Sequence, residues 1–217
     1  TQRVATEDIP DWMWAFNPAV RSYPHDPGMA RTLLREAGWR PGSDGIMRKG
    51  GDKLTLVMVT NNSNATRRRE TLEIQAMLRE AGIDAEIKYY PGDVLFAPAG
   101  MGGILQLGRF DLSMAGWYSG VDPDDSSQYT CKNFPPGGYN YSRYCSPQME
   151  AAQKIALTSY DRATRTAAYY RIQELLARDN PELFIYWLRQ MEPVSVDFRG
   201  FDPNPVIESW NAWQWSI

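Results

Sequence analysis

Apolar residues recur along this chain with helical spacing in some segments and with strand spacing in others. Apolar residues spaced three and four positions apart predict helices over 27–37 and 65–81, a helix starting at 147 and another over 162–179. Short apolar or alternating runs predict strands over 54–60, 84–90, 110–116 and 183–187. Strand, helix and strand follow one another over 54–90, which indicates a βαβ unit with parallel strands and an α/β fold.

Capping residues mark where these helices begin and end. Acceptor side chains that suit the N-cap position precede three of them: Asp26, Asn64 and Asp161. Pro27 fits the first helical position, and Gly38 is expected to end the first helix as a left-handed cap, as Gly82 ends the second. Both helices finish with Leu-Arg-Glu-Ala-Gly. This match indicates shared capping chemistry and not a duplicated domain, because nothing around it repeats.

The apolar stripes predict which helix faces are buried. Met149, Ala152 and Ile155 are expected to point inward from the helix that starts at 147. The last helix presents a stripe made of Ala168, Tyr169, Ile172, Leu175 and Leu176. Arg67, Arg68 and Arg69 open the helix over 65–81, where cations oppose the helix dipole, so a solvated face is expected. Contact with a partner or a ligand carboxylate is the alternative.

The stretch 110–125 is the first place to look for a binding site. It begins as an apolar run typical of a buried strand and passes at Gly116 into Trp117, Tyr118 and an acidic turn. Ligands bind beyond the carboxyl ends of strands in open α/β sheets, so these two aromatic residues are candidates to contact a ligand. The alternative is an ordinary turn with both rings packed in the core.

Composition narrows the class of protein. The chain has 217 residues, 43% of them hydrophobic, which suits one large domain or two small ones. A net charge of -3 without a basic stripe argues against a nucleic-acid partner, and no apolar run reaches the length of a membrane span. Eight tryptophans indicate either a Trp-rich core or a surface that stacks on ligands. The chain starts with Thr1, as a processed chain or an excised piece would.

Catalytic and metal-binding patterns are weak. The single histidine, His25, has no Gly-x-Ser-x-Gly partner, so nucleophilic catalysis is not expected. Asp122, Asp124 and Asp125 could serve as glycosidase carboxylates, but in one tight turn they are expected to cap a helix or to stay solvated. A calcium loop would need a glycine that is missing. We expect no cofactor, no metal and no enzymatic activity.

The two cysteines share one loop. Cys131 and Cys145 are close enough in sequence to bridge, which would indicate an oxidising compartment. Two free thiols in a cytosolic loop are the alternative that spacing leaves open.

The order of these motifs resembles the extracytoplasmic solute-binding proteins of ABC importers, in the oligopeptide-, dipeptide- and nickel-binding family. The segments that carry the resemblance are 26–39, 74–84, 110–117, 122–124, 140–145, 149–177 and 200–201. Together they cover nearly the whole chain, although each motif alone is weak.

The resemblance implies one lobe of a two-lobed periplasmic-binding-protein fold (type II-like), with a mixed sheet flanked by helices. It predicts a hinge or entry segment over 1–25, a C-terminal ligand-binding lobe over 26–200, and a tail over 201–217 that returns towards the first lobe. A full receptor would be about twice as long. The resemblance also favours the Cys131–Cys145 disulfide, a periplasmic or extracytoplasmic location, and two partners: an ABC permease and the absent N-terminal lobe.

One departure from the family pattern bears on the ligand. The resemblance implies an aspartate shortly after Gly116-Trp117 that holds a peptide's α-amino group, whereas the first carboxylate here is Asp122. Either Asp122 takes that role, or the ligand is a blocked peptide or an oligosaccharide. The residues expected to line the cleft are Trp117, Tyr118, Ser119, Gly120, Asp122, Asn61 and Asn62. A less favoured hypothesis is a carbohydrate-active enzyme that uses Asp122 and Asp124.

Overall fold

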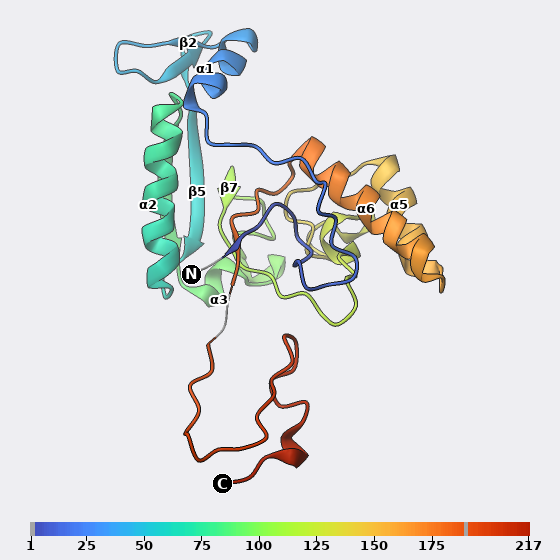
Figure 1. Ribbon diagram of the computed structural model, residues 1–217. Helices are drawn as coiled ribbons and strands as arrows, with labels where there is room; N and C mark the ends of the chain where they lie inside the picture. The colour runs from blue at the N-terminus through green and yellow to red at the C-terminus, as the bar shows by residue number, and fades with distance from the viewer. Residues whose placement is uncertain (1–2, 189–190) are drawn as a thin grey trace. The chain divides into compact units, whose positions relative to one another are not determined.

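The computed structural model describes residues 3–188 and 191–217 (Figure 1). Its contacts divide the chain into two units. Unit 2 comprises 23–117 and 132–143, and unit 1 takes its described residues from 1–22, 118–131 and 144–217. Each unit is described by itself. No helix in the described ranges is long and apolar enough to cross a membrane.

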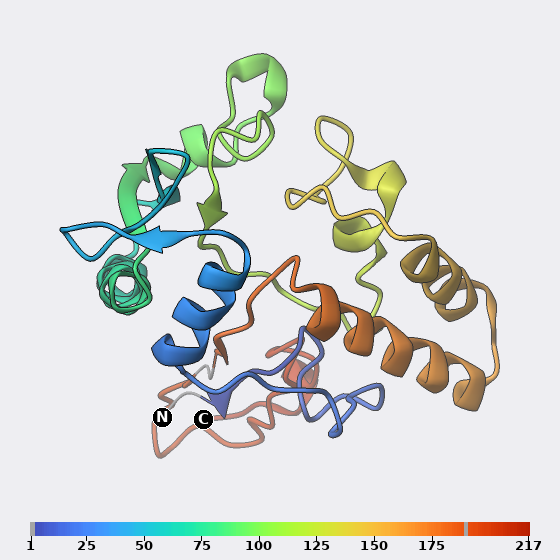
Figure 2. The same ribbon diagram turned by 90° about the horizontal axis from the view of Figure 1, so that it is seen from above.

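Unit 2 is built on a parallel sheet with the strand order β6-β5-β7. The central strand β5 (Thr55–Asn61) pairs with β6 (Asp84–Tyr90) over its whole length and with β7 (Leu112–Ser113) on its other side. Helix α2 (Ala65–Glu80) connects β5 to β6 and packs against both; Figure 2 shows it end-on. The predicted βαβ unit and its parallel strands are therefore confirmed.

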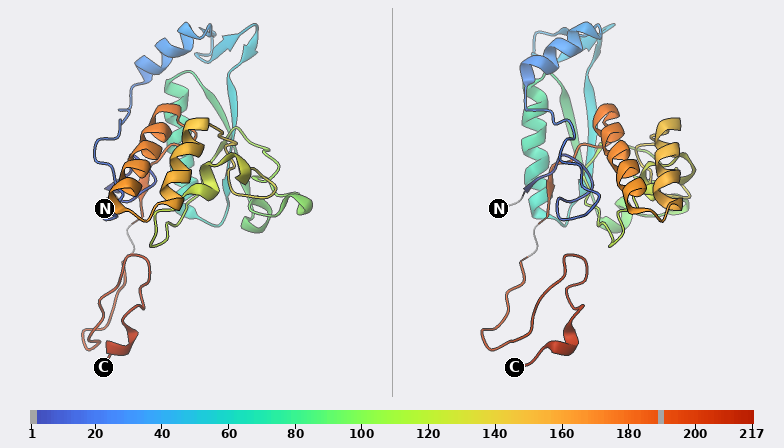
Figure 3. Two further views of the ribbon diagram at one scale, coloured as in Figure 1. Left: turned by 90° about the vertical axis from the view of Figure 1, so that its right-hand side faces the viewer. Right: turned by 45° about the vertical axis from the view of Figure 1, so that its right-hand side comes forward.

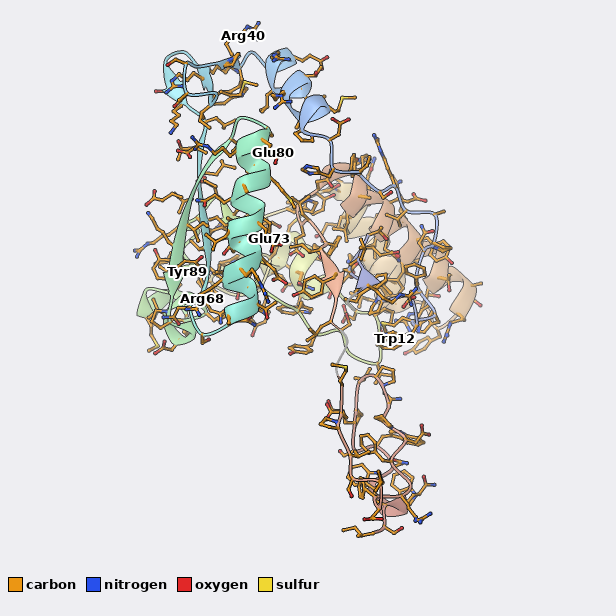
Figure 4. The ribbon with its side chains drawn as sticks, turned by 60° about the vertical axis from the view of Figure 1, so that its left-hand side comes forward. Trp12, Arg40, Arg68, Glu73, Glu80 and Tyr89 are labelled. Carbon is orange, nitrogen blue, oxygen red and sulfur yellow. A yellow bond between two sulfur atoms is a disulfide. The ribbon has the colours of Figure 1, made fainter. Side chains whose placement is uncertain are left out.

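A pair of hydroxyl groups joins α2 to β6. Thr71 Oγ1 lies 3.2 Å from Tyr89 Oη, and Figure 4 shows Tyr89 beside Arg68 in the first turns of the helix. Glu73 and Glu80 follow along the same helix. Thr71 is the buried residue of this helix.

The prediction of a buried strand over 110–116 was wrong in both length and burial. Only Leu112 and Ser113 pair with β5, and Ser113 and Ala115 are exposed. The carboxylate of Asp111 accepts the backbone N–H of Val57 (2.7 Å), a donor that a longer ladder would have used. A strand at the edge of a sheet has a neighbour on one side only, so apolar sequence does not ensure its burial.

The predicted helix caps are confirmed. Side-chain oxygens of Asp26, Asn64 and Asp161 accept backbone N–H groups in the first turns of α1 (Pro27–Glu36), α2 and α6 (Arg162–Asp179), at 2.7 to 2.9 Å. Gly38 and Gly82 have φ of +92° and +86°. The residue after each glycine donates to a carbonyl five positions back, at 2.9 Å in both helices. The shared Leu-Arg-Glu-Ala-Gly segment therefore forms the same C-terminal cap twice.

Short elements complete unit 2. They are an antiparallel three-stranded sheet of β2 (Arg40–Pro41), β3 (Met47–Lys49) and β4 (Asp52–Lys53), helix α3 (Gly92–Leu95) and a 3-10 turn, Ala99–Met101. The buried core of the unit is formed by Val59, Leu95, Ile104 and Leu105, with Val57, Tyr90, Phe110 and Tyr141 packed against it. This core lies against β5 and so supports the strand that ends at Asn61.

Unit 1 is mainly helical. Helix α5 (Pro147–Thr158) and helix α6 form an antiparallel hairpin, seen side by side in Figure 3. The other elements are the antiparallel pair β1 (Arg3–Val4) and β8 (Tyr186–Trp187), helix α4 (Ser126–Tyr129), and 3-10 turns at Cys131–Asn133 and Ala212–Gln214. The strand predicted over 183–187 is thus shorter than expected.

The core of unit 1 confirms the stripe predicted for α6 and corrects the one predicted for α5. All five residues of the α6 stripe are buried, as are Met149 and Ala152 of α5. Ile155, however, is 46% exposed, and its neighbour Ala156 is fully buried in its place. The buried face of α5 also contains Gln153, which donates to the buried Asp125 at 2.6 Å, so this polar contact and Ala156 turn inward and Ile155 turns out.

Candidate ligand-binding site

The carboxyl end of β5 places two polar side chains where ligands bind in open α/β sheets. Asn61 is buried, and its amide nitrogen donates to Ser63 Oγ (2.8 Å), which fixes its orientation. Asn62 is exposed, and its backbone N–H donates to the carbonyl of Tyr90 at the end of β6 (2.8 Å). Their roles as ligand contacts stay predictions.

An aromatic pair lies just beyond β7 in the same unit. Trp117 is 49% exposed, and its ring meets the ring of Tyr139 edge to face, with centroids 5.5 Å apart. Tyr139 in turn contacts Tyr141 at 6.2 Å, and Tyr141 packs on the core of the unit. The proposal that Trp117 is a core residue is therefore wrong. Its ring is held in place at one edge and open to solvent elsewhere, as in a stacking surface.

Arg67 reaches from α2 to the same edge of the sheet. Its Nη1 donates to Asn61 Oδ1 at 2.9 Å. A Cβ atom added at Gly116 would lie 2.7 Å from Nη2, so the guanidinium covers the backbone of Gly116. The expected solvated face therefore describes Arg68 and Arg69, which are exposed, but not Arg67.

The remaining predicted ligand contacts belong to unit 1. The division falls between Trp117 and Tyr118, so the predicted site residues are shared between the two units. Tyr118 is 84% exposed, and Ser119 and Gly120 are also exposed. Tyr118 is thus not a core residue either. The roles of these three residues as ligand contacts stay predictions.

Asp122 forms an ion pair inside unit 1. The Nη2 of Arg165 lies 2.7 and 2.8 Å from its two carboxylate oxygens, and Tyr169 Oη lies 3.4 Å from Oδ1. The carboxylate raises the pKa of Arg165, whose guanidinium also lies 5.2 Å from the centre of the Trp14 ring. Both carboxylate oxygens of Asp122 therefore already contact a cationic side chain of the same protein.

The other two aspartates of the acidic turn have structural partners. Asp124 Oδ1 accepts the backbone N–H of Ser126 (3.0 Å), the first residue of α4, whose N-cap position is held by Asp125. Asp125 is buried and accepts a hydrogen bond from Gln153 Nε2 (2.6 Å). No group of three or more histidine, cysteine, aspartate or glutamate side chains in the described part of the chain is placed to hold a metal ion.

Asp125 belongs to a group of buried acids that the sequence did not reveal. Burial raises the pKa of Glu7 to about 8 and that of Asp8 to about 6. Burial together with the nearby Asp8 charge raises the pKa of Asp125 well above its ordinary value. Burial also raises the pKa of Glu182, which accepts a hydrogen bond from Tyr129 Oη (3.0 Å). Unit 1 therefore holds protons on buried carboxyl groups near neutral pH.

The cysteine pair is bridged. Cys131 and Cys145 form a disulfide with a Cα–Cα distance of 4.9 Å. The segment that it closes carries Tyr139 and Tyr141, so the disulfide restricts the loop that supplies the aromatic partner of Trp117. The bridging alternative is thereby confirmed over that of free thiols.

Comparison with known proteins assigns the chain to a family. Residues 1–138 match the model of the bacterial extracellular solute-binding proteins, family 5, middle part. The chain belongs to this family. It is similar to the oligopeptide-binding protein AppA of Bacillus subtilis (23% identity over 94% of this chain and 37% of AppA). It is also similar to the dipeptide-binding protein of Escherichia coli, with 28% identity over 91% of this chain and 35% of the relative.

Solved structures agree on the fold of this family member. The structure of Bacillus subtilis AppA in complex with a nonapeptide superimposes with a TM-score of 0.81 at 22% identity, over all of this chain and 42% of AppA. NikZ of Campylobacter jejuni in complex with Ni(L-His) gives a TM-score of 0.80 at 20% identity, over all of this chain and 44% of NikZ. The fold is that of a partial two-lobed solute-binding protein. The family member spans 35–37% of these curated relatives, which are therefore more than twice its length.

Sequence patterns missed two residues of this site. Tyr139 stands in the cysteine loop beside the Asn140-Tyr141 motif, and its aromatic character was the available signal. Arg67 was grouped with two exposed arginines, although it lies three residues after its N-cap and faces Asn61. A side chain in the first turn of a helix that follows a parallel strand can reach that strand's end, which would have singled Arg67 out.

Proposed function

We propose that this chain is part of the substrate-binding component of an ABC importer, which captures a peptide-like solute and delivers it to a membrane permease. The ligand would be enclosed between this lobe and an N-terminal lobe, by hinge closure of the kind that periplasmic binding proteins use. The observation that carries the proposal is the aromatic pair Trp117–Tyr139, half exposed beyond the carboxyl edge of the sheet in a member of the solute-binding family. Each ring of the pair contacts another aromatic ring and still leaves about half of its side chain open to a ligand.

Three further observations support this proposal. The matched family model describes extracellular proteins, and the disulfide suits an oxidising, extracytoplasmic location. Relatives are described as oligopeptide- and dipeptide-binding proteins. Asp122 is paired with Arg165, and Asp124 accepts the backbone N–H of Ser126, which weighs against glycosidase chemistry and for a receptor without enzymatic activity. Within the receptor we assign residues 1–25 to the hinge, 26–200 to the lobe and 201–217 to the returning tail.

The test is a calorimetric and thermal-shift screen of the full-length receptor that contains this chain. The panel consists of dipeptides, blocked peptides, oligosaccharides and nickel chelates. A ligand present at 100 times its Kd should add about 2.7 kcal/mol to the free energy of unfolding, which a shift in Tm would reveal. We expect peptides to bind and Trp117→Ala to weaken them about tenfold or more, as the loss of a buried aromatic contact does.

Two outcomes would contradict the proposal. Binding of oligosaccharides with no response to any peptide would replace the peptide receptor by a sugar receptor. Micromolar binding by the isolated lobe would contradict enclosure between two lobes, because a lobe alone offers only half of the contacts.

A further inference from the structure

Arg67 occupies a position at which its positive charge lowers the stability of helix α2. It stands in the first turn of α2, and its backbone N–H donates to the N-cap Asn64 Oδ1 at 2.9 Å. A cation in the first turn opposes the positive end of the helix dipole. The side chain does not relieve this by extending into water, since it is half-buried and folds back to the end of β5.

The guanidinium of Arg67 lies across two segments of the sheet edge. Its Nη1 donates to Asn61 Oδ1, and Asn61 is itself held by Ser63. Its Nη2 lies against Gly116, where an added Cβ would be only 2.7 Å away. Gly116 precedes the half-exposed Trp117, so the cation lies one residue from the position of the indole, within the same unit.

The charge of Arg67 is not balanced within the described residues. No aspartate or glutamate among them forms an ion pair with it, and its one side-chain partner is a neutral amide. A guanidinium has five donors in a planar fork that matches a carboxylate. Most of these donors are left for another group. An anion is the favoured partner, because both the guanidinium and the N-terminus of the helix attract negative charge.

Asp122 shows the opposite situation. One alternative is that it takes over the α-amino group of a peptide, but both of its oxygens already accept from Arg165 Nη2. Holding an ammonium group there would require this ion pair to open. The Asp122 carboxylate is thus already taken in unit 1, whereas the Arg67 guanidinium of unit 2 has no carboxylate partner among the described residues.

We propose that Arg67 binds a carboxylate group of the solute, and that this receptor selects its ligand by that carboxylate and not by an ammonium group at Asp122. The inference rests on the proposed function, which it deepens. Asn61 positions the guanidinium, Gly116 leaves room for it, and Trp117 provides the apolar wall next to it. Arg67 is then a specificity-determining residue of the site.

The experiment measures binding of matched peptides to the full-length receptor by calorimetry. Di- to pentapeptides of alanine and phenylalanine are each prepared in four forms: free, C-terminal amide, N-acetyl, and blocked at both ends. We expect amidation to weaken binding at least tenfold and N-acetylation to change it less than threefold. Arg67→Gln should bind the free and amidated forms equally, at the affinity of the amide for the wild type.

Two further variants separate recognition from folding. Arg69→Gln removes the same charge from an exposed position two residues along α2, a different side of the helix, and should keep the tenfold preference. Gly116→Ala should displace the guanidinium and reduce the preference without touching its charge. The Tm of each unliganded variant should stay within a few degrees of the wild type.

Equal affinity of wild type for the free and amidated peptides would overturn the inference. So would an Arg67→Gln variant that loses the same factor for both forms, since that indicates a structural role. A preference for free over acetylated amino termini, abolished by Asp122→Asn, would show that the ammonium site operates after all. If no peptide binds in any form, the proposed function itself fails, and this inference fails with it.

Discussion

The buried acid Glu7 should make unit 1 less stable as the pH rises through neutrality. Its side chain is 1% exposed, and burial raises its pKa from 4.5 to about 8. The backbone N–H of Asn17 opposes this shift only in part, since it donates to Gln173 Oε1 at 2.9 Å. The folded unit therefore keeps a proton on Glu7 over a range of pH in which the unfolded chain has lost it.

The sign and size of the effect follow from proton linkage. Between about pH 4.5 and pH 8 the folded state binds more protons than the unfolded state, so the free energy of unfolding falls with rising pH. One such group lowers it by about 1.4 kcal/mol per pH unit. From pH 5 to pH 7 the loss assigned to Glu7 is therefore on the order of 3 kcal/mol. Asp8, Asp125 and Glu182 act in the same direction, because burial raises the pKa of each.

Hydrogen exchange of backbone amides in α6, corrected for the intrinsic pH dependence, measures the opening free energy of unit 1. The assay uses the full-length receptor at pH 5, 6, 7 and 8. We expect the opening free energy to fall across this series and the slope to decrease by up to about 1.4 kcal/mol per pH unit in Glu7→Gln. Glu73→Gln, an exposed acid on α2, should leave the slope unchanged. A wild-type profile that is flat or rises from pH 5 to pH 8 would refute the reasoning.

Two other substitutions test local structure, each with a measurement of stability by urea denaturation. Removal of the disulfide by Cys145→Ser should lower the free energy of unfolding by about 3 kcal/mol, because the loop of 14 residues regains its chain entropy in the unfolded state. An unchanged free energy of unfolding would mean that the loop is ordered without the disulfide. Gly82→Ala should cost about 1–3 kcal/mol, since it meets both a left-handed φ of +86° and Met47 Cγ at 2.9 Å. Gly51 has a φ of +96° but open space around it, so Gly51→Ala should lower the free energy of unfolding only by the backbone contribution. An equal loss of stability in both variants would contradict the steric contribution at Gly82.

The site was predicted only in part, for a reason that its geometry makes clear. A rule about strand ends located Asn61, Asn62 and Trp117, because Asn61 ends β5, Asn62 follows it and Trp117 lies four residues beyond β7. Arg67 and Tyr139 complete the surface from a helix and from the cysteine loop. Pairing across such separations depends on how the sheet edge, the helix and the loop fold together.

What the sequence by itself determined was local. Asp26, Asn64 and Asp161 cap their helices, and the repeated Leu-Arg-Glu-Ala-Gly ends two of them, because these hydrogen bonds join residues at most five apart. The stripe of α6 was likewise settled by helical periodicity, since its buried residues recur three and four positions apart.

Tertiary structure decided whatever depends on a distant partner. Ile155 lost its inward place to Ala156 because the face of α5 that turns inward also makes a buried polar contact with Asp125. Asp122 forms an ion pair with Arg165, which lies 43 residues away along the sequence. Buried acids came together from the N-terminal segment, α4 and residue 182. Local hydrogen bonds and helical periodicity depend on residues that are neighbours in the sequence. Burial and charge pairing arise only when segments that are remote in the sequence pack together and exclude water.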